Sequence, residues 1–312
     1  MFCQCIKTKF INKNTRMKNF KKASSVYSFL ALFSFVLLLS SCSDNNNDPQ
    51  LPALPRLNVN DSIAMVKVNK AINGAYIWWD DTDKNTWKKY VQFELDKKEN
   101  EYRIIKVEYE DFIAGNFPIE ITQLTKLRTL NLSYGNLGGF IPKEIGNLTE
   151  LENLIIENNF VSGELPESIG KLSKLKLLLI RYTGIFGNLP ATWGNLENLQ
   201  KLDLSHNYLT GPIPKEWKGL KNLETIVLSD NQLNGAFPIE IMTHLMQFVC
   251  NNNNITELPF EIWKDDFEVE PPYITGNRLH GIVPDWVKAT NKWKYSNIYV
   301  GKQQDGYGYT LN

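Results

Sequence analysis

Residues 124–147 read LTKLRTLNLSYGNLGGFIPKEIGN, and residues 148–171 read LTELENLIIENNFVSGELPESIGK. The two stretches match position by position, and the same pattern continues through the next two units. An internal repeat of this length indicates a solenoid, because one unit cannot bury its apolar face alone and must stack on its neighbours. The prolines of the pattern recur at a constant spacing, at Pro142, Pro166, Pro190, Pro214 and Pro238.

The leucines of each unit predict a short strand with one buried face. In the unit around residue 200, Leu202 and Leu204 alternate with Lys201 and Asp203. Side chains alternate along a strand, so the leucines point into the core and the polar residues point outward. Stacked units then pair their strands in parallel, about 4.8 Å apart, and their leucines merge into one core.

Two further positions recur where the backbone must turn after the strand. Asn207, repeated as Asn159 and Asn231, is predicted to hydrogen-bond backbone groups that water cannot reach. Gly135 and Thr183 interrupt this series, so we expect a local rearrangement there. A glycine four residues further on marks a backbone position that a Cβ atom would not tolerate. These glycines are Gly139, Gly163, Gly187, Gly211 and Gly235.

The repeated pattern L-x-x-L-x-L-x-x-N-x-L-x-G-x-I-P resembles the leucine-rich repeat family, and within it the longer type first associated with plant receptors. The resemblance covers residues 104–284. It implies an α/β-type solenoid, a leucine-rich-repeat superhelix with a parallel concave β-sheet, an N-terminal helical cap and a C-terminal cap. It also implies a non-enzymatic protein that binds a ligand, most often another protein.

The segments on either side of the repeats are predicted to close the two ends of the core. Residues 57–103 contain a helix with Asp61 as its N-cap and with Ile63, Met65, Val66 and Ile72 available for burial. Residues 285–312 form the C-terminal cap. Aromatic residues are frequent in both caps: Trp78, Trp79, Trp87, Trp286, Trp293, Tyr295 and Tyr299.

The coil that follows the N-terminal cap is degenerate. Ile105, Val107 and Tyr109 alternate one position out of phase with the later repeats. We therefore expect its strand to be entered by a different turn.

Residues 1–41 have the features of a secretory signal peptide. They carry seven Lys or Arg residues, no acidic residue and an apolar run from Val26 to Leu39. This run is shorter than the roughly 20 residues that a membrane-spanning helix needs. The sequence Leu39-Ser40-Ser41-Cys42 resembles a bacterial lipobox, which implies that Cys42 is lipidated. An ordinary signal peptide with an incidental cysteine is the alternative. We expect Met17 to be the true start, since residues 1–16 add nothing that a signal peptide needs. Residues 42–56 are polar and proline-rich, as expected of a flexible tether.

The charge of the chain argues against nucleic acid as a partner. Its 34 basic residues equal its 34 acidic ones, and removal of the signal peptide leaves 27 basic residues, a net charge of about −7. This negative net charge repels phosphate backbones.

Of the four cysteines, Cys42 and Cys250 remain after processing, so no disulfide framework is available. Cys250 occupies a core leucine position and is predicted to be a small buried apolar residue.

No constellation in the sequence points to catalysis, a metal or a cofactor. His206, His244 and His280 lie in different repeats without metal-ligand spacing. Asp203, Ser205 and His206 lie on one predicted strand, where fixed side-chain directions prevent a relayed triad. The glycines belong to the repeat and not to a phosphate-binding loop.

The period maps outward strand positions onto three rows across the concave face. The first row is Asn131, Ile155, Leu179, Asp203 and Val227. The second is Ser133, Glu157, Arg181, Ser205 and Ser229. The third is Tyr134, Asn158, Tyr182, His206 and Asp230. Exposed apolar, Tyr and Arg side chains are the types that dominate protein-binding hot spots, although strand propensity alone also favours Ile, Val and Tyr. The candidate ligand-binding residues are Tyr134, Ile155, Glu157, Leu179, Arg181, Tyr182, Asp203, His206 and Val227.

Taken together, these features predict a lipid-anchored protein of the bacterial cell envelope, most simply the outer membrane, that binds a protein partner on its concave face. A glycan-binding accessory lipoprotein of a nutrient-uptake system, using the aromatic residues of the caps, is the alternative. In the first case the binding residues lie on the strand rows, and in the second they cluster at one end.

Overall fold

The computed structural model describes residues 56–72, 90–109, 113–264, 272–296, 303–304 and 306–310. All of them belong to one compact unit, Pro55–Ile77 together with Lys88–Asn312. The predicted signal peptide, Cys42 and Trp78, Trp79 and Trp87 lie outside the described residues.

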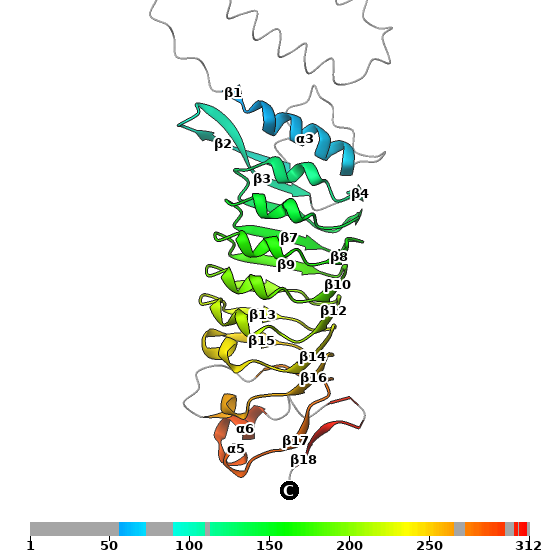
Figure 1. The fold of residues 1–312 in the computed structure, drawn as a ribbon, viewed down its shortest axis with the longest axis vertical. Coiled ribbons are helices and arrows are strands. Elements are labelled where there is room, and N and C mark those ends of the chain that lie inside the picture. Colours follow the sequence, from blue (N-terminus) through cyan, green and yellow to red (C-terminus); the bar gives the residue numbers. More distant parts are fainter. Residues whose placement is uncertain are drawn as a thin grey trace, which may run out of the picture. The chain divides into compact units, whose positions relative to one another are not determined.

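Each coil of the solenoid contributes its first strand to one long, largely parallel sheet (Figure 1). Strands of successive regular coils pair at equivalent positions of the repeat, with Leu130 opposite Leu154 and Leu178 opposite Leu202. The fold class predicted from the repeat is therefore confirmed. The sheet contains β1 (Arg56–Leu57), β2 (Val91–Asp96), β3 (Glu101–Tyr109), β5 (Thr129–Leu132), β7 (Asn153–Glu157), β9 (Leu177–Arg181), β11 (Lys201–Asp203), β13 (Thr225–Val227) and β15 (Gln247–Val249), with β2 antiparallel to β3.

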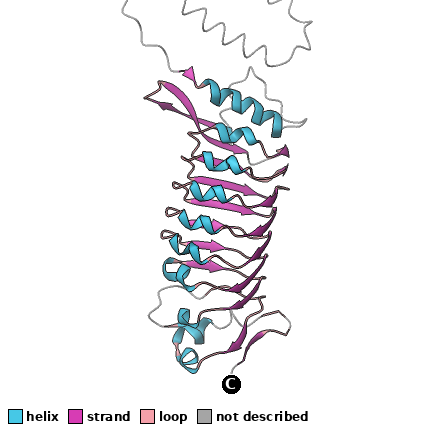
Figure 2. Cartoon of the chain, in the orientation of Figure 1, coloured by secondary structure: helices cyan, strands magenta, loops and turns pink. Residues whose placement is uncertain are grey.

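A second strand in each coil builds a side sheet, and a short 3-10 helix completes the coil on another side (Figure 2). The side-sheet strands are β8 (Ser162–Glu164), β10 (Gly184–Asn188), β12 (Tyr208–Gly211), β14 (Gln232–Ala236) and β16 (Asn254–Glu257), and a separate pair is formed by β4 (Ala114–Asn116) and β6 (Asn136–Gly138). The 3-10 helices are η2 (Ile119–Gln123), η3 (Lys143–Asn147), η4 (Glu167–Lys171), η5 (Ala191–Asn195), η6 (Lys215–Gly219), η7 (Ile239–His244) and η8 (Phe260–Trp263). Each follows a proline, whose fixed φ suits a helix start.

The core is a stack of equivalent apolar side chains. The repeat leucines are buried in every coil, as predicted. In η5 and η6 the large anchors Trp193 and Trp217 stack with ring planes 6° apart. Their indole N–H groups donate to the carbonyls of Pro166 and Pro190, at 3.1 and 2.9 Å. The two tryptophans thus tie each coil to the one before it.

A series of buried asparagines hydrogen-bonds the backbone where each strand ends. Asn207 Nδ2 donates to the Ile180 carbonyl of the preceding coil at 2.8 Å, and Asn207 Oδ1 accepts from the Ile185 backbone N–H at 3.3 Å. Thr183 takes the place of the asparagine in its coil, and its hydroxyl donates to Asn207 Oδ1 at 2.6 Å. The predicted role is confirmed in each of the five coils that carry the residue. The series comprises Asn159, Asn207, Asn231, Asn253 and Asn277.

The recurring glycines also have the predicted role. Gly163 has φ +95°, a backbone conformation that side chains with a Cβ rarely adopt. A Cβ added to Gly211, at φ +75°, would lie 2.5 Å from Asn188 Oδ1. The glycine is therefore needed for the backbone conformation and for the close approach of neighbouring coils.

The N-terminal helix α3 (Val59–Ile72) covers the start of the core, contacting η2 and β4, but its cap differs from the prediction. The Asn58 side chain accepts from the backbone N–H groups of Asn60 and Asp61, so Asn58 caps the helix. Asp61 is buried and binds the Arg103 guanidinium through two 3.0 Å hydrogen bonds, which the sequence analysis missed. Ile63 is 49% exposed, because the helix turns Ala64 and Val68 inward instead.

The first coil is out of phase as predicted. Val107 and Tyr109 of β3 pair with Leu130 and Leu132, so the spacing between these two coils is one position shorter than the regular repeat. Its strand is also entered by a different turn, as predicted. The turn at residues 97–100 joins β3 to the antiparallel strand β2, whereas a 3-10 helix precedes the strands of the later coils.

At the C-terminal end, the short helices α5 (Asp285–Ala289) and α6 (Asn291–Ser296) follow the last coil. Trp293 is buried and meets Trp263 edge to face, with ring centroids 5.2 Å apart. Strand β17 (His280–Ile282) pairs in parallel with β18 (Gly308–Thr310). These contacts cover the apolar end of the stack.

Candidate binding face of the long sheet

The outward side of the long sheet, called here the sheet face, carries a half-buried apolar patch. Leu179 of β9 lies opposite Ile155 of β7, and Leu177 lies two residues before Leu179 on the same side. These three residues, called here the apolar patch, form a continuous surface over two strands. Val227 and Val249 form a second apolar pair on β13 and β15. Leu177 and Val249 are not among the candidates predicted from the sequence, although the same period predicts their outward direction.

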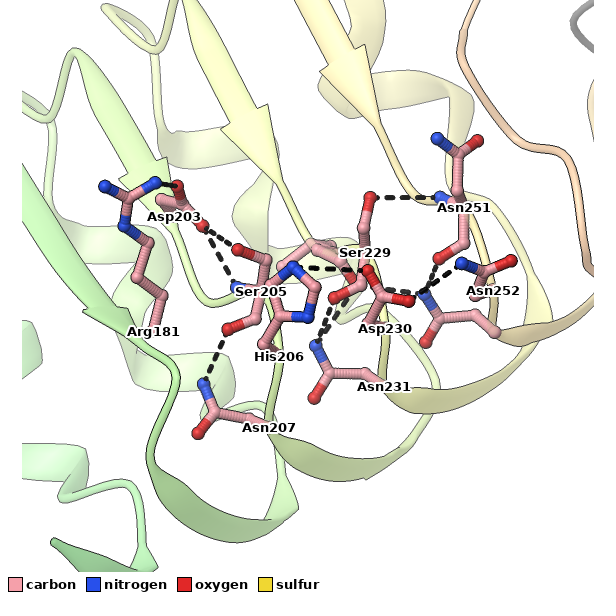
Figure 3. A network of polar contacts seen from close by, with 12 residues as sticks. Arg181, Asp203, Ser205, His206, Asn207, Ser229, Asp230, Asn231, Asn251 and Asn252 are labelled. Atoms are coloured by element: carbon pink, nitrogen blue, oxygen red, sulfur yellow. Dashed lines mark hydrogen bonds and ion pairs between the residues drawn. The ribbon is translucent and has the colours of Figure 1, made fainter. Parts of the chain in front are cut away.

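Arg181 links three adjacent strands beside the apolar patch. Its guanidinium lies 2.9 Å from Glu157 Oε2 on β7 and 3.5 Å from Asp203 Oδ2 on β11. Both carboxylates are nearly buried, whereas the Arg181 side chain is 35% exposed. The hydrogen bond to Glu157 raises the pKa of Arg181 above its usual value. One cation thus balances two nearly buried carboxylates. Figure 3 shows the contact of Arg181 with Asp203.

The predicted third row is not on the strands. Its residues follow the strand ends and adopt a left-handed backbone with φ between 51° and 57°. This conformation costs a residue other than glycine roughly 1 kcal/mol, less for Asn and Asp. We call this set the edge row: Tyr134, Asn158, Tyr182, His206, Asp230 and Asn252.

Side chains of the edge row contact one another along the stack. The Tyr182 and His206 rings stack with centroids 3.9 Å apart and planes 13° apart. His206 Nε2 lies 3.4 Å from Asp230 Oδ2, and Asn252 Nδ2 donates to Asp230 Oδ1 at 2.7 Å. Figure 3 shows this run of contacts from His206 to Asn252. The row is a continuous polar and aromatic rim of the sheet face.

Several predicted row residues are buried instead of exposed. Glu157 and Asp203 are covered because they bind Arg181. The short serine side chains bond groups beside them. Ser205 Oγ donates to Asp203 Oδ1 at 2.6 Å, and Ser229 Oγ accepts from the Asn251 backbone N–H at 3.2 Å. The buried members are Asn131, Ser133, Glu157, Asp203, Ser205 and Ser229. A partner can therefore meet Tyr134, Ile155, Leu179, Arg181, Tyr182, His206 and Val227 directly.

The polar contacts of Asp203, Ser205 and His206 do not form a nucleophile–base–acid relay. Ser205 donates to Asp203, whereas His206 is directed to Asp230. Within the described residues, no group of His, Cys, Asp and Glu side chains could hold a metal ion. Cys250 is buried, and burial raises the pKa of its thiol well above the usual value.

The aromatic residues of the caps do not form a platform in the part of the chain that the structure describes. Trp293 is buried, and Trp286 is 43% exposed on α5. Trp78, Trp79 and Tyr299 and the side chain of Tyr295 lie outside the described residues. No described helix is both long and apolar enough to cross a membrane.

The stacked coils, the asparagine series and the exposed sheet face define a leucine-rich-repeat solenoid. The leucine-rich repeat region family matches residues 102–297, and the chain belongs to this family. No curated protein matches the chain.

Solved structures with this fold include proteins of plants. A plant ice-binding protein has a TM-score of 0.63 and 27% identity, covering 73% of this chain and 74% of its own. The Arabidopsis receptor kinase HAESA, in complex with the peptide hormone IDA and the co-receptor SERK1, has a TM-score of 0.56 and 28% identity over 67% of this chain. The TDR receptor has a TM-score of 0.52 and 30% identity over 56% of this chain. The match spans 34% of the HAESA chain and 32% of the TDR chain.

Proposed function

We propose that this protein is a non-enzymatic, lipid-anchored component of a bacterial cell envelope that binds a protein partner on its sheet face. One observation carries the proposal. The apolar patch, Arg181 and the exposed rings of Tyr134 and Tyr182 lie together on one rigid surface without serving the core. Apolar, Tyr and Arg side chains in one cluster are typical of binding hot spots.

The rigidity of this surface supports binding. The strands of the apolar patch are paired on both sides, and Arg181 is held by two carboxylates. A partner therefore does not have to order the backbone when it binds, and less binding energy is lost. The receptor HAESA, which has the same fold, was solved with a peptide hormone and a co-receptor bound. That likeness supports a peptide or protein partner for this chain.

The lipid anchor is supported by the N-terminal sequence. The basic, acid-free segment and the run from Val26 to Leu39 lead directly into Ser40-Ser41-Cys42. Processing at Cys42 would leave residues 43–55 as a tether before the first described strand, which begins at Arg56. Attachment at the outer membrane would hold the sheet face within reach of envelope or host proteins.

The test is partner capture by the purified protein from a panel of envelope and host proteins, with a glycan array beside it. The variant Leu179→Asp/Tyr182→Ala adds a charge to the apolar patch and removes a ring from the edge row. We expect it to weaken binding of the captured protein by about 100-fold, since hot-spot changes cost about 2 kcal/mol or more.

A matched control makes the same kinds of change elsewhere. Ile282→Asp/Tyr307→Ala alters two exposed residues of the C-terminal cap, and we expect it to bind the captured protein as the wild type does. A protein that binds both variants equally well would contradict the sheet-face proposal, as would an array on which only glycans bind.

A further inference from the structure

The side sheet differs in chemistry from the rest of the surface. Its strands contain only two charged residues, Glu164 and Glu257. The other outward residues are amides, hydroxyls, glycines and aromatic rings. The sheet face, by contrast, holds the Arg181 ion pairs, and the helix side of the coils carries ion pairs such as Lys174 with Glu150. We call the outward side of β8, β10, β12, β14 and β16, with Phe140 beside them, the side face.

Four large rings are exposed on or beside the side face. Phe140 is 68%, Phe160 70%, Phe186 47% and Tyr208 59% exposed. They come from four consecutive coils. The inward positions next to them are filled by Ile141, Val161, Ile185 and Leu209, which form the core. A cluster of apolar rings that remain this exposed indicates a contact surface.

Strand pairing places these rings near one another. Phe186 of β10 lies directly opposite Tyr208 of β12. Phe140 lies opposite Ser162, and Phe160 precedes Ser162 by two residues, so Phe140 and Phe160 are diagonal neighbours. Diagonal neighbours on paired strands are within reach of aromatic side chains. The rings thus form two pairs along the stack, Phe140 with Phe160 and Phe186 with Tyr208, and Glu164 of β8 lies opposite Phe186 on its other side.

Hydrogen-bonding groups without charge accompany the rings. Asn188 ends β10 beside Phe186, and Thr210 on β12 donates its hydroxyl to the Gly187 carbonyl at 3.3 Å. Past these strands, a hollow of about 400 Å³ is lined by Asn188, Leu189, Pro212, Ile213 and Pro214 and by one charged residue of each sign, Lys215 and Glu216. The surface combines flat apolar rings, neutral donors and acceptors, and a depression at its edge.

From this combination we infer that the side face binds a neutral polysaccharide. A sugar ring has an apolar C–H face, which an aromatic ring covers, and hydroxyl edges, which amides and hydroxyls bond. A charged polymer would find almost no counter-charge here, and unpaired charge at an interface is costly. The coils repeat about every 4.8 Å, close to the length of one sugar unit, so successive sugars of an extended chain can meet successive coils.

This site is separate from the proposed protein site. It lies on the side sheet, whereas the apolar patch and the edge row belong to the long sheet and its rim. It also differs from the glycan site predicted on the aromatic residues of the caps, since none of those residues belongs to the side face. Failure of one proposal therefore leaves the other standing.

The experiment is affinity electrophoresis of the full chain, purified in detergent, through native gels that contain a soluble polysaccharide. The probes are galactomannan, xyloglucan, mixed-linkage β-glucan and amylopectin, with polygalacturonate as the charged comparison. We expect at least one neutral polymer to retard the protein. The variant Phe186→Ser/Tyr208→Ser should lose this retardation at least about tenfold in apparent affinity, because stacking rings dominate such contacts.

Two control variants test whether a loss of retardation comes from the missing rings or from unfolding of the protein. Phe186→Tyr/Tyr208→Phe keeps both rings and should bind as the wild type does. Ile282→Ser/Tyr307→Ser removes two exposed side chains of the C-terminal cap and should also leave retardation unchanged. Unfolding temperatures of all variants are measured to confirm that they are folded.

Several results would overturn the inference. These are no retardation by any neutral polymer, retardation by polygalacturonate alone, and equal retardation of Phe186→Ser/Tyr208→Ser and the wild type. Because the chain is similar to a plant ice-binding protein, the experiment also includes an assay of ice recrystallisation. If the wild type slows ice recrystallisation, the serine variant does not, and no polymer is bound, the side face is an ice-binding surface instead.

Discussion

At the scale of single residues, the tyrosines of the edge row combine an unfavourable left-handed backbone conformation with solvent-exposed side chains. Tyr134 and Tyr182 have φ of 57° and 53° and are 58% and 47% exposed. Asn and Asp tolerate this backbone well, but Tyr does not. An exposed ring at a costly backbone position stabilises neither the turn nor the core. Strain of this kind points to function, which is why these two residues support the binding proposal.

Arg181 gives a prediction at the same scale. The variant Arg181→Met replaces the aliphatic part of the side chain but leaves the carboxylates of Glu157 and Asp203 nearly buried without a cation. We expect the free energy of unfolding to fall by about 1–3 kcal/mol, below the full cost of breaking a buried pair because Arg181 is partly exposed. Urea unfolding measures this change.

A second variant also removes one of the two carboxylate charges that Arg181→Met leaves without a cation. Arg181→Met/Glu157→Gln should recover part of the lost free energy, since a neutral amide is less costly to bury than an unpaired carboxylate. If the double variant is less stable than the single one, the ion pair is not the source of the effect.

At the scale of the element, the asparagine series ties each turn to the coil before it. Asn207→Ala removes the bond to the Ile180 carbonyl and leaves the Ile185 N–H and the Thr183 hydroxyl without their acceptor. We expect a loss of about 2–4 kcal/mol, because each buried group left unpaired costs about 1–3 kcal/mol. Thermal or urea unfolding would show it as a large drop.

An exposed amide in the next coil is the control. Gln232 begins β14 on the side face and is exposed. Gln232→Ala should change the free energy of unfolding by no more than about 0.5 kcal/mol, as surface substitutions usually do. Equal losses at Asn207 and Gln232 would show that the buried amide has no special role.

At the scale of the whole molecule, the solenoid is held together by contacts between neighbouring coils. The two ends are therefore the places where unfolding begins, and the caps determine how easily it does so. At the N-terminal end, buried Asp61 of α3 holds Arg103 and also accepts from the Ile104 backbone N–H at 2.9 Å. At the C-terminal end, Trp293 and Trp263 provide the apolar contact.

The C-terminal contact predicts a local effect on stability. Trp293→Ala should lower the free energy of unfolding by about 3 kcal/mol, the lower end of the range for truncating a buried tryptophan. Hydrogen exchange should speed up in β15, β16 and η8 and remain slow in β5, β7 and β9. If hydrogen exchange speeds up equally throughout the solenoid, the solenoid unfolds as one unit and the cap does not stabilise the C-terminal end alone.

The sequence predicted the elements that repeat and failed where a residue acts alone. The evenly spaced prolines, the alternating leucines and the recurring asparagines determine the coil, because each position has the same surroundings in every unit. Asp61, by contrast, suited an N-cap by residue type, yet Asn58 has that role and Asp61 binds Arg103. That partner lies 42 residues further along the chain, so no local pattern could reveal it.

The candidate binding face likewise combines features that the sequence predicted with features that it could not reveal. The period alone placed Ile155, Leu179, Tyr182 and Val227 on the outward side, and it determined the family and the class of fold. Only the tertiary structure decided which of these positions a partner can reach. Arg181 draws Glu157 and Asp203 under its guanidinium, and the left-handed turns lift Tyr134 and Tyr182 to the rim. The physical reason is that side-chain direction follows from the strand period, whereas exposure depends on residues of the neighbouring coils that fold over or pair with each position.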